Sequence, residues 1–282
     1  RELGSDRALT AIINLLDNPR SEDPGALNAR EVAEGRDQAA PNSLALDAGQ
    51  TVDQQLIGLQ YEDLSAGEGE LYLKGFIAQR DFEQQLPFVG SSRLGYQRDY
   101  MGASAEYHHE VTLGNLPLNY IVGVDAVRQK DDRFRNDVNP QGAVGEPLAD
   151  ETQTATSTGV FAQGDLALSE QLSLSLGARF DRVALDVDDD FAADGDQSGQ
   201  RTFNEWSGSA GLSYRYRPQH QAYINTGTAF ETPTFSEFAN PAGGGFNPSV
   251  EPQKAWNREV GLRGYIEPLA LDYDVALFSV RV

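Results

Sequence analysis

The sequence predicts an all-β protein whose strands form an antiparallel transmembrane β-barrel. Apolar and polar residues alternate with period 2 along most of the 282 residues, which is typical of strands with one apolar and one polar face. Short and long connections between the strand candidates alternate strictly, as they do in outer-membrane barrels. Several candidates also reach the ~9 to 11 residues that a tilted strand needs to cross a bilayer.

Five strands show the clearest alternation of apolar and polar residues. In 98–110, Met101, Ala103 and Ala105 oppose polar residues at even positions, and in 117–129 the apolar residues occupy the even positions. In 172–187 the even positions are apolar up to Phe180, while Arg179 and other polar residues share the opposite face. The pattern returns in 202–216 and 269–282. The full set of predicted strands is 7–16, 51–61, 70–80, 98–110, 117–129, 153–168, 172–187, 202–216, 219–230, 257–266 and 269–282.

The connections set the direction of the strands. Long connections are predicted at 17–50, 81–97, 131–152, 188–201 and 231–256, and short ones lie between them. Since long loops of outer-membrane barrels are extracellular, the strands at 70–80, 117–129, 172–187, 219–230 and 269–282 should run outward. Within the first long loop, Asn28 and Glu31 have the spacing of a capping box, which predicts a short helix over 29–39.

Composition excludes several classes of function. There are 22 Lys and Arg against 43 Asp and Glu, a formal charge of -21, which would repel a phosphate backbone, so no nucleic-acid partner is expected. No run approaches the ~18 apolar residues of a transmembrane helix. Cysteine is absent, which removes disulfides and thiolate metal sites. No cofactor is expected.

Catalysis is not expected either. Histidine occurs only at 108, 109 and 220, and His108 alone lies clearly on a polar strand face, two residues after Glu106. A hydrolase would need a nucleophile beside such a histidine. The sequence offers no nucleophile motif, so we do not predict an enzyme.

Two segments that begin about twenty residues apart carry a family resemblance. They are Phe230-Glu231-Thr232-Pro233-Thr234-Phe235-Ser236-Glu237-Phe238 and Glu251-Pro252-Gln253-Lys254-Ala255-Trp256-Asn257-Arg258-Glu259-Val260-Gly261-Leu262-Arg263-Gly264. Together they resemble the barrel signature of TonB-dependent receptors, of the kind that take up siderophores. Gln253 and Arg258 depart from the commoner residues at their places in that signature.

The resemblance implies a barrel of ~22 strands with a plugged lumen. Residues 1–282 would then be a central part of the barrel domain, with the plug domain and the C-terminal strands absent. It also implies the outer membrane of a Gram-negative bacterium, contact with its lipids, and TonB-energised uptake through the missing plug. The implied ligand is a ferric siderophore or other iron chelate. A passive porin-like barrel and a soluble β-sandwich binding module remain alternative readings, since both contain alternating strands.

Candidate ligand-binding residues lie in the predicted loops and on the polar strand faces. Arg133 and Arg135 follow the strand at 117–129 and are bidentate donors suited to carboxylate or catecholate oxygens. Arg179 lies on a polar face, and Phe246 and Asn247 lie in a glycine-rich loop tip. The acidic run with Asp186, Asp188 and Asp190 has carboxylates that suit Ca²⁺, but it lacks the glycine and glutamate of an EF-hand loop, so no metal site is predicted.

Overall fold

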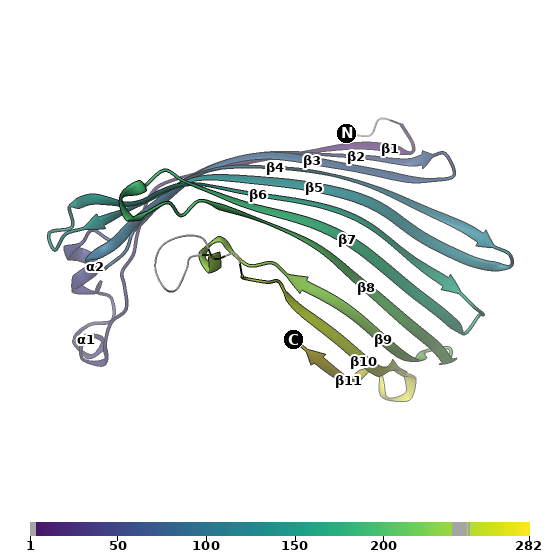
Figure 1. The fold of residues 1–282 in the computed structure, drawn as a ribbon. Coiled ribbons are helices and arrows are strands. Elements are labelled where there is room, and N and C mark those ends of the chain that lie inside the picture. Colours follow the sequence, from purple (N-terminus) through teal and green to yellow (C-terminus); the bar gives the residue numbers. More distant parts are fainter. Residues whose placement is uncertain (1–3, 239–246, 248) are drawn as a thin grey trace.

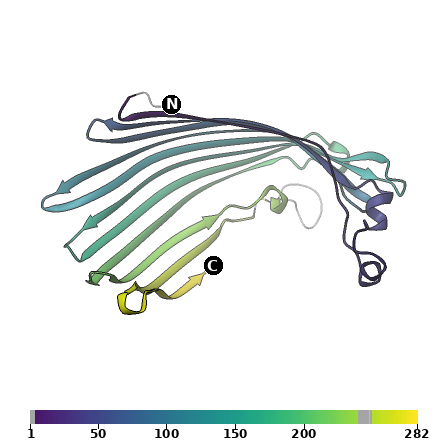
Figure 2. The ribbon, with the colours of Figure 1, turned by 180° about the vertical axis from the view of Figure 1, so that it is seen from behind.

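The chain forms one sheet that bends into an open arch (Figures 1 and 2). The structure is a computed structural model and describes residues 4–238, 247 and 249–282. Each strand pairs antiparallel with the next in chain order, and β1 and β11 form the two edges. The eleven strands among these residues are β1 (Arg7–Glu22), β2 (Gly49–Ala66), β3 (Gly69–Gln85), β4 (Gly90–Leu113), β5 (Leu116–Val138), β6 (Val144–Ala167), β7 (Leu172–Asp189), β8 (Gly199–Arg217), β9 (His220–Glu231), β10 (Gln253–Ile266) and β11 (Leu271–Arg281).

Helices are short and lie outside the sheet. The elements are α1 (Ala29–Glu34), α2 (Pro41–Ala45) and three 3-10 turns, η1 (Ala192–Asp194), η2 (Phe235–Phe238) and η3 (Glu267–Leu269). The predicted capping box is confirmed, because Asn28 accepts from the Glu31 backbone N–H and its own N–H donates to the Glu31 carboxylate. The helix ends at Glu34, five residues before the predicted end.

No helix among the described residues is both long enough and apolar enough to span a membrane.

All eleven predicted strands are present, but most are longer than predicted. The expected long connections at 81–97 and 131–152 are hairpins whose turns occupy only 86–89 and 139–143. The strands continue into these segments with polar residues on both faces, so the apolar alternation that marks a strand in the sequence stops before the strand does. The prediction of loops there was wrong for this reason.

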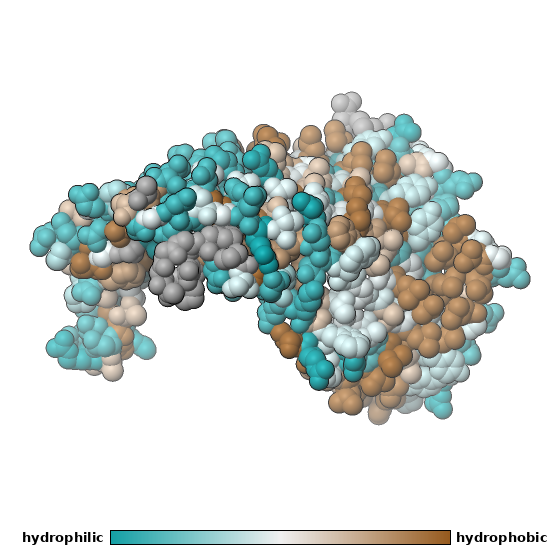
Figure 3. Space-filling model, in the orientation of Figure 1, coloured by the Kyte–Doolittle hydropathy of each residue, from teal (hydrophilic) through white to brown (hydrophobic). Residues whose placement is uncertain are grey.

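One face of the sheet is apolar and uncovered. Its residues form rows across the strands, such as Ile13, Ile57, Ile77 and Met101, which are register partners on β1 to β4 and are 68%, 49%, 60% and 47% exposed. We call this side the apolar face and the opposite side the polar face. Figure 3 shows hydrophobic residues gathered toward the short turns and hydrophilic ones at the end that carries α1 and α2, which we call the helix end. A β-sandwich would cover this face with a second sheet, so the single layer excludes that alternative.

A small core forms where η2 packs on the polar face of β7 and β8. Phe238 of η2 is 2% exposed and lies against Leu185 and Phe203. At the same place the ladder between β8 and β9 is incomplete, since it covers only 209–217 and 220–227. The η2 segment therefore packs inward at the place where β8 and β9 separate, left of the centre of Figure 1.

Candidate functional site

A pocket of about 600 Å³ opens on the polar face at the helix end. We call it the rim pocket. Its walls come from β5, β6 and β7, from the turn that follows β7, and from η2. Its lining includes Arg133, Arg135, Glu151, Asp189, Phe235 and Phe238. The pocket exists because η2 packs inward and faces the wall of strands.

Arg133 and Arg135 lie in this pocket, and both belong to β5 where the sequence predicted a loop. They share the polar face because they are two residues apart on one strand. Arg133 donates to the carboxylate of Glu151, its register partner on β6. Arg135 forms no ion pair or hydrogen bond with a described residue, and its Nε is buried without a partner. A partly buried guanidinium that faces a pocket and has an unpartnered N–H is suited to an anion.

The carboxylates of the pocket are already occupied by protein donors. Glu151 accepts from Arg133 and, at 2.9 Å, from the side chain of Gln153. Asp189 accepts from the backbone N–H groups of Phe191 and Gln197 at 3.0 and 2.9 Å. None of these acids pairs with Arg135. Arg135 is therefore the cation of the pocket that no described carboxylate pairs with, and phenyl rings of η2 lie beside it.

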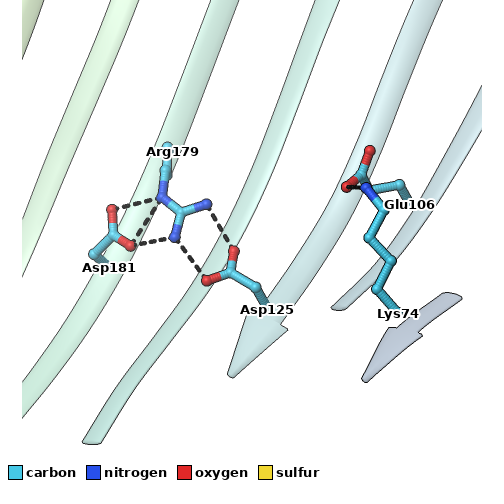
Figure 4. Close-up of polar contacts among 5 residues, drawn as sticks. All are labelled: Lys74, Glu106, Asp125, Arg179 and Asp181. Atoms are coloured by element: carbon cyan, nitrogen blue, oxygen red, sulfur yellow. Dashed lines mark hydrogen bonds and ion pairs between the residues drawn. The ribbon is translucent and has the colours of Figure 1, made fainter. Parts of the chain in front are cut away.

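Ion pairs cross the strands farther down the polar face (Figure 4). Arg179 of β7 donates to Asp125 of β5 at 2.7 and 3.0 Å and to Asp181 at 2.9 Å, and its guanidinium lies 5.6 Å from the Phe161 ring centroid. That ring lies over Gly123, where a Cβ would meet it at 2.4 Å, so the glycine makes the stack possible. Lys74 pairs with Glu106 at 3.4 Å.

A second bidentate pair joins Arg98 of β4 to Asp131 of β5, at 2.7 and 2.6 Å. Asp131 is 4% exposed. Sequence reasoning missed this pair, although both residues belong to the polar face of their strands. The period-2 alternation could have indicated it, because Asp125, Asp131, Arg133 and Arg135 all occupy odd positions of one strand and so share its polar face.

The remaining predicted site residues do not join the rim pocket. Arg179 is held by two aspartates on the strand wall. Asn247 accepts from the backbone N–H and hydroxyl of Ser249 at 3.1 and 2.6 Å, in a local turn outside the pocket lining. Phe246 lies outside the described residues. Of the predicted binding residues that the structure describes, Arg133 and Arg135 alone lie together in the rim pocket.

The acidic run is mostly strand and not a loop. Asp186 and Asp188 are exposed residues of β7, opposite Gln200 of β8 and Thr152 of β6 respectively. Asp190 follows the strand, and its N–H donates to the Asp150 carbonyl at 2.9 Å. Within the described ranges, no three His, Asp or Glu side chains are grouped so that they could hold a metal ion.

The η2 segment begins with a turn that depends on Glu237. The backbone N–H and the hydroxyl of Thr234 both donate to this carboxylate, at 2.7 and 2.8 Å, and these bonds lower the pKa of Glu237 below its usual value. A lowered pKa gives stability that is complete above the unfolded-state pKa and is lost as the pH falls through the folded-state pKa.

We therefore expect wild type to melt at a higher temperature than E237Q at neutral pH. The difference should shrink as the pH falls from about 6 to about 3. Melting of the natural full-length protein in detergent measures it. E146Q, at an exposed carboxylate without a described partner, is the matched control. A difference between wild type and E237Q that stays constant with pH would contradict the role of Glu237.

Sequence comparison places the chain in one family of known proteins. The family described as "TonB dependent receptor-like, beta-barrel" matches residues 3–282. The match covers almost the whole chain, including every strand of the sheet.

Solved structures share the fold. The ferric citrate transporter FecA, in its unliganded form, is 17% identical with a TM-score of 0.80, over 98% of this chain and 41% of that chain. The alcaligin outer-membrane receptor FauA from Bordetella pertussis is 17% identical with a TM-score of 0.71, over 99% and 41%. The copper transporter OprC is 14% identical with a TM-score of 0.63, over 83% and 39%. The chain thus spans about two fifths of the length of these proteins.

Proposed function

Because the chain belongs to the TonB-dependent receptor β-barrel family, we propose that it forms part of the wall of a receptor that binds an anionic iron chelate, such as a ferric siderophore, and imports it with energy from TonB. Members of this family are outer-membrane receptors and transporters of Gram-negative bacteria, not enzymes. In this setting the apolar face contacts lipid, the polar face lines the lumen, and the helix end is extracellular.

The observation that carries the proposed ligand class is Arg135. Its guanidinium lies in a pocket at the extracellular end, and its Nε–H has no partner among the described residues. Ferric chelates with carboxylate or catecholate oxygens are anions, and such oxygens accept paired N–H donors from arginine. Phe235 adds an apolar wall that suits the organic part of a chelate.

Transport rests on the same geometry. The polar face carries mixed charges from the rim pocket down to the short turns, with Arg179 and Lys74 each paired to acids. A solvated lumen wall of this kind, closed by a plug, allows passage only when the plug moves. We therefore assign release of the ligand to a TonB-driven step on the natural full-length protein.

Replacing Arg135 by glutamine should weaken chelate binding about tenfold or more, since a hydrogen bond to a charged group contributes about 1.5 to 3 kcal/mol. The measurement is titration of the natural full-length receptor with ferric citrate, a ferric tricatecholate and a ferric hydroxamate. The matched control is R36Q, an exposed arginine that follows α1 and has no described partner.

Uptake of the bound chelate in cells with and without TonB tests the energised step. Loss of uptake without TonB is the expected result. Uptake that persists without TonB would instead indicate a passive pore. Equal binding by wild type and R135Q would remove the rim pocket from the ligand site and leave the family assignment untouched.

A further inference from the structure

An apolar groove crosses the lipid-facing side of the last strands. Leu212, Ile224, Val260 and Leu277 form a register-matched row from β8 to β11, and Leu174 of β7 extends it. These five residues line a depression of about 780 Å³. Leu277 is 75% exposed and Ile224 57% exposed, so no part of the described chain covers the groove.

The extracellular end of the groove is polar. Arg258 and Trp256 lie on the same face of β10 as Val260, one and two steps of the alternation farther out, respectively. The indole N–H of Trp256 donates to the hydroxyl of Thr226 at 2.7 Å, and the Arg258 guanidinium lies 3.7 Å from the centroid of the Trp256 ring. The indole therefore holds the cation at the boundary between the apolar row and the aqueous side.

Arg258 has no acidic partner in the part of the chain that the structure describes. It forms no ion pair or hydrogen bond with a described residue. The adjacent Glu259 points to the polar face and accepts from the hydroxyl of Tyr223 at 2.7 Å. The lumenal arginines Arg98 and Arg179, in contrast, are each held by aspartate. In a chain with a formal charge of -21, a cation that no described acid pairs with, beside an apolar groove, points to a ligand that joins an anion to an apolar chain.

We propose that this groove binds a phosphorylated, acylated lipid of the outer leaflet, with an acyl chain along the row from Leu212 to Leu277 and a phosphate on Arg258. An acyl chain that lies in the groove makes van der Waals contacts with the apolar side chains that line it. The planar guanidinium of Arg258 matches the geometry of a phosphate. Tryptophan at this depth anchors the boundary between the hydrocarbon and the headgroups. The site is on the opposite face from the rim pocket and does not depend on the chelate.

The test is native mass spectrometry of the natural full-length receptor in detergent, with lipid A as the probe. We expect R258Q to weaken lipid A binding at least tenfold, to the level that wild type shows for dephosphorylated lipid A. The matched control is R182Q. Arg182 is also exposed and without a described partner, and lies two residues beyond Phe180 on the apolar face of β7, outside the groove.

Three results would overturn the proposal. Equal weakening by R258Q and R182Q would mean that basic residues attract the lipid without a defined site. Equal binding of lipid A and its dephosphorylated form would remove the phosphate from the interaction. Competition by glucosamine 1-phosphate at the same concentration as lipid A would show that the groove contributes nothing. Each result leaves chelate binding, and so the proposed function, unaffected.

Discussion

Replacing Arg179 by methionine should lower the free energy of unfolding by about 2 to 3 kcal/mol, because it leaves two neighbouring carboxylates without their cation. Arg179 donates to Asp125 on β5 and to Asp181, two residues away on β7, and Asp181 is only 6% exposed. Removing one partner of a fully buried pair costs about 3 to 5 kcal/mol. The expected cost is smaller here because the Arg179 and Asp125 side chains are 33% and 26% exposed.

Urea unfolding of the natural full-length protein in detergent, followed by tryptophan fluorescence, measures this change. R182M is the matched control and should stay within about 0.5 kcal/mol of wild type, as surface substitutions usually do. The triple variant R179M/D125N/D181N removes all the charges and should recover much of the loss. If R179M unfolds like R182M, the ion pairs do not stabilise the wall.

Replacing Phe238 by alanine should release η2 from the strand wall. Phe238 is 2% exposed and stacks on Phe203, with ring centroids 6.4 Å apart. Truncating a buried phenylalanine costs about 3 to 5 kcal/mol. Phe238 packs the short η2 segment on the sheet and does not connect two strands. The lost free energy should therefore appear as local unfolding of η2, while the sheet stays folded.

Hydrogen exchange of residues 234–238 measures this opening. Protection there should fall by two or more orders of magnitude, since each 1.4 kcal/mol is about tenfold, while the strands keep theirs. F88A is the matched control, because Phe88 lies in a turn and is 49% exposed. Since η2 lines the rim pocket, F238A should weaken chelate binding as well. Unchanged protection would show that η2 is held by other contacts.

The strands and their two faces could be predicted because alternation is a local property. On β7, each residue from Leu172 to Asp181 already shows in the sequence which face it occupies, and the register with β6 and β8 keeps those faces aligned. The capping box at Asn28 is local in the same way. Each of these features depends on residues within a few positions of one another.

The outer parts of β4, β5 and β6 could not be predicted from this signal. Beyond the apolar rows both faces meet water, so Asp131, Arg133 and Glu151 read as loop although they form a ladder. Pairing with a neighbouring strand keeps them extended, and that pairing is absent from the local sequence.

The sequence by itself determined the all-β wall, its lipid-facing rows and the family signature around Pro233 and Gly261. Only the tertiary structure decided which charged side chains form ion pairs and which do not. Arg133 and Arg135 look equivalent in the sequence, yet the cross-strand register pairs Glu151 with Arg133 and leaves Arg135 without an ion pair among the described residues. The inward packing of Phe238 then encloses that free guanidinium in a pocket. Ion pairing between strands depends on contacts tens of residues apart, and a pattern of period 2 cannot encode them.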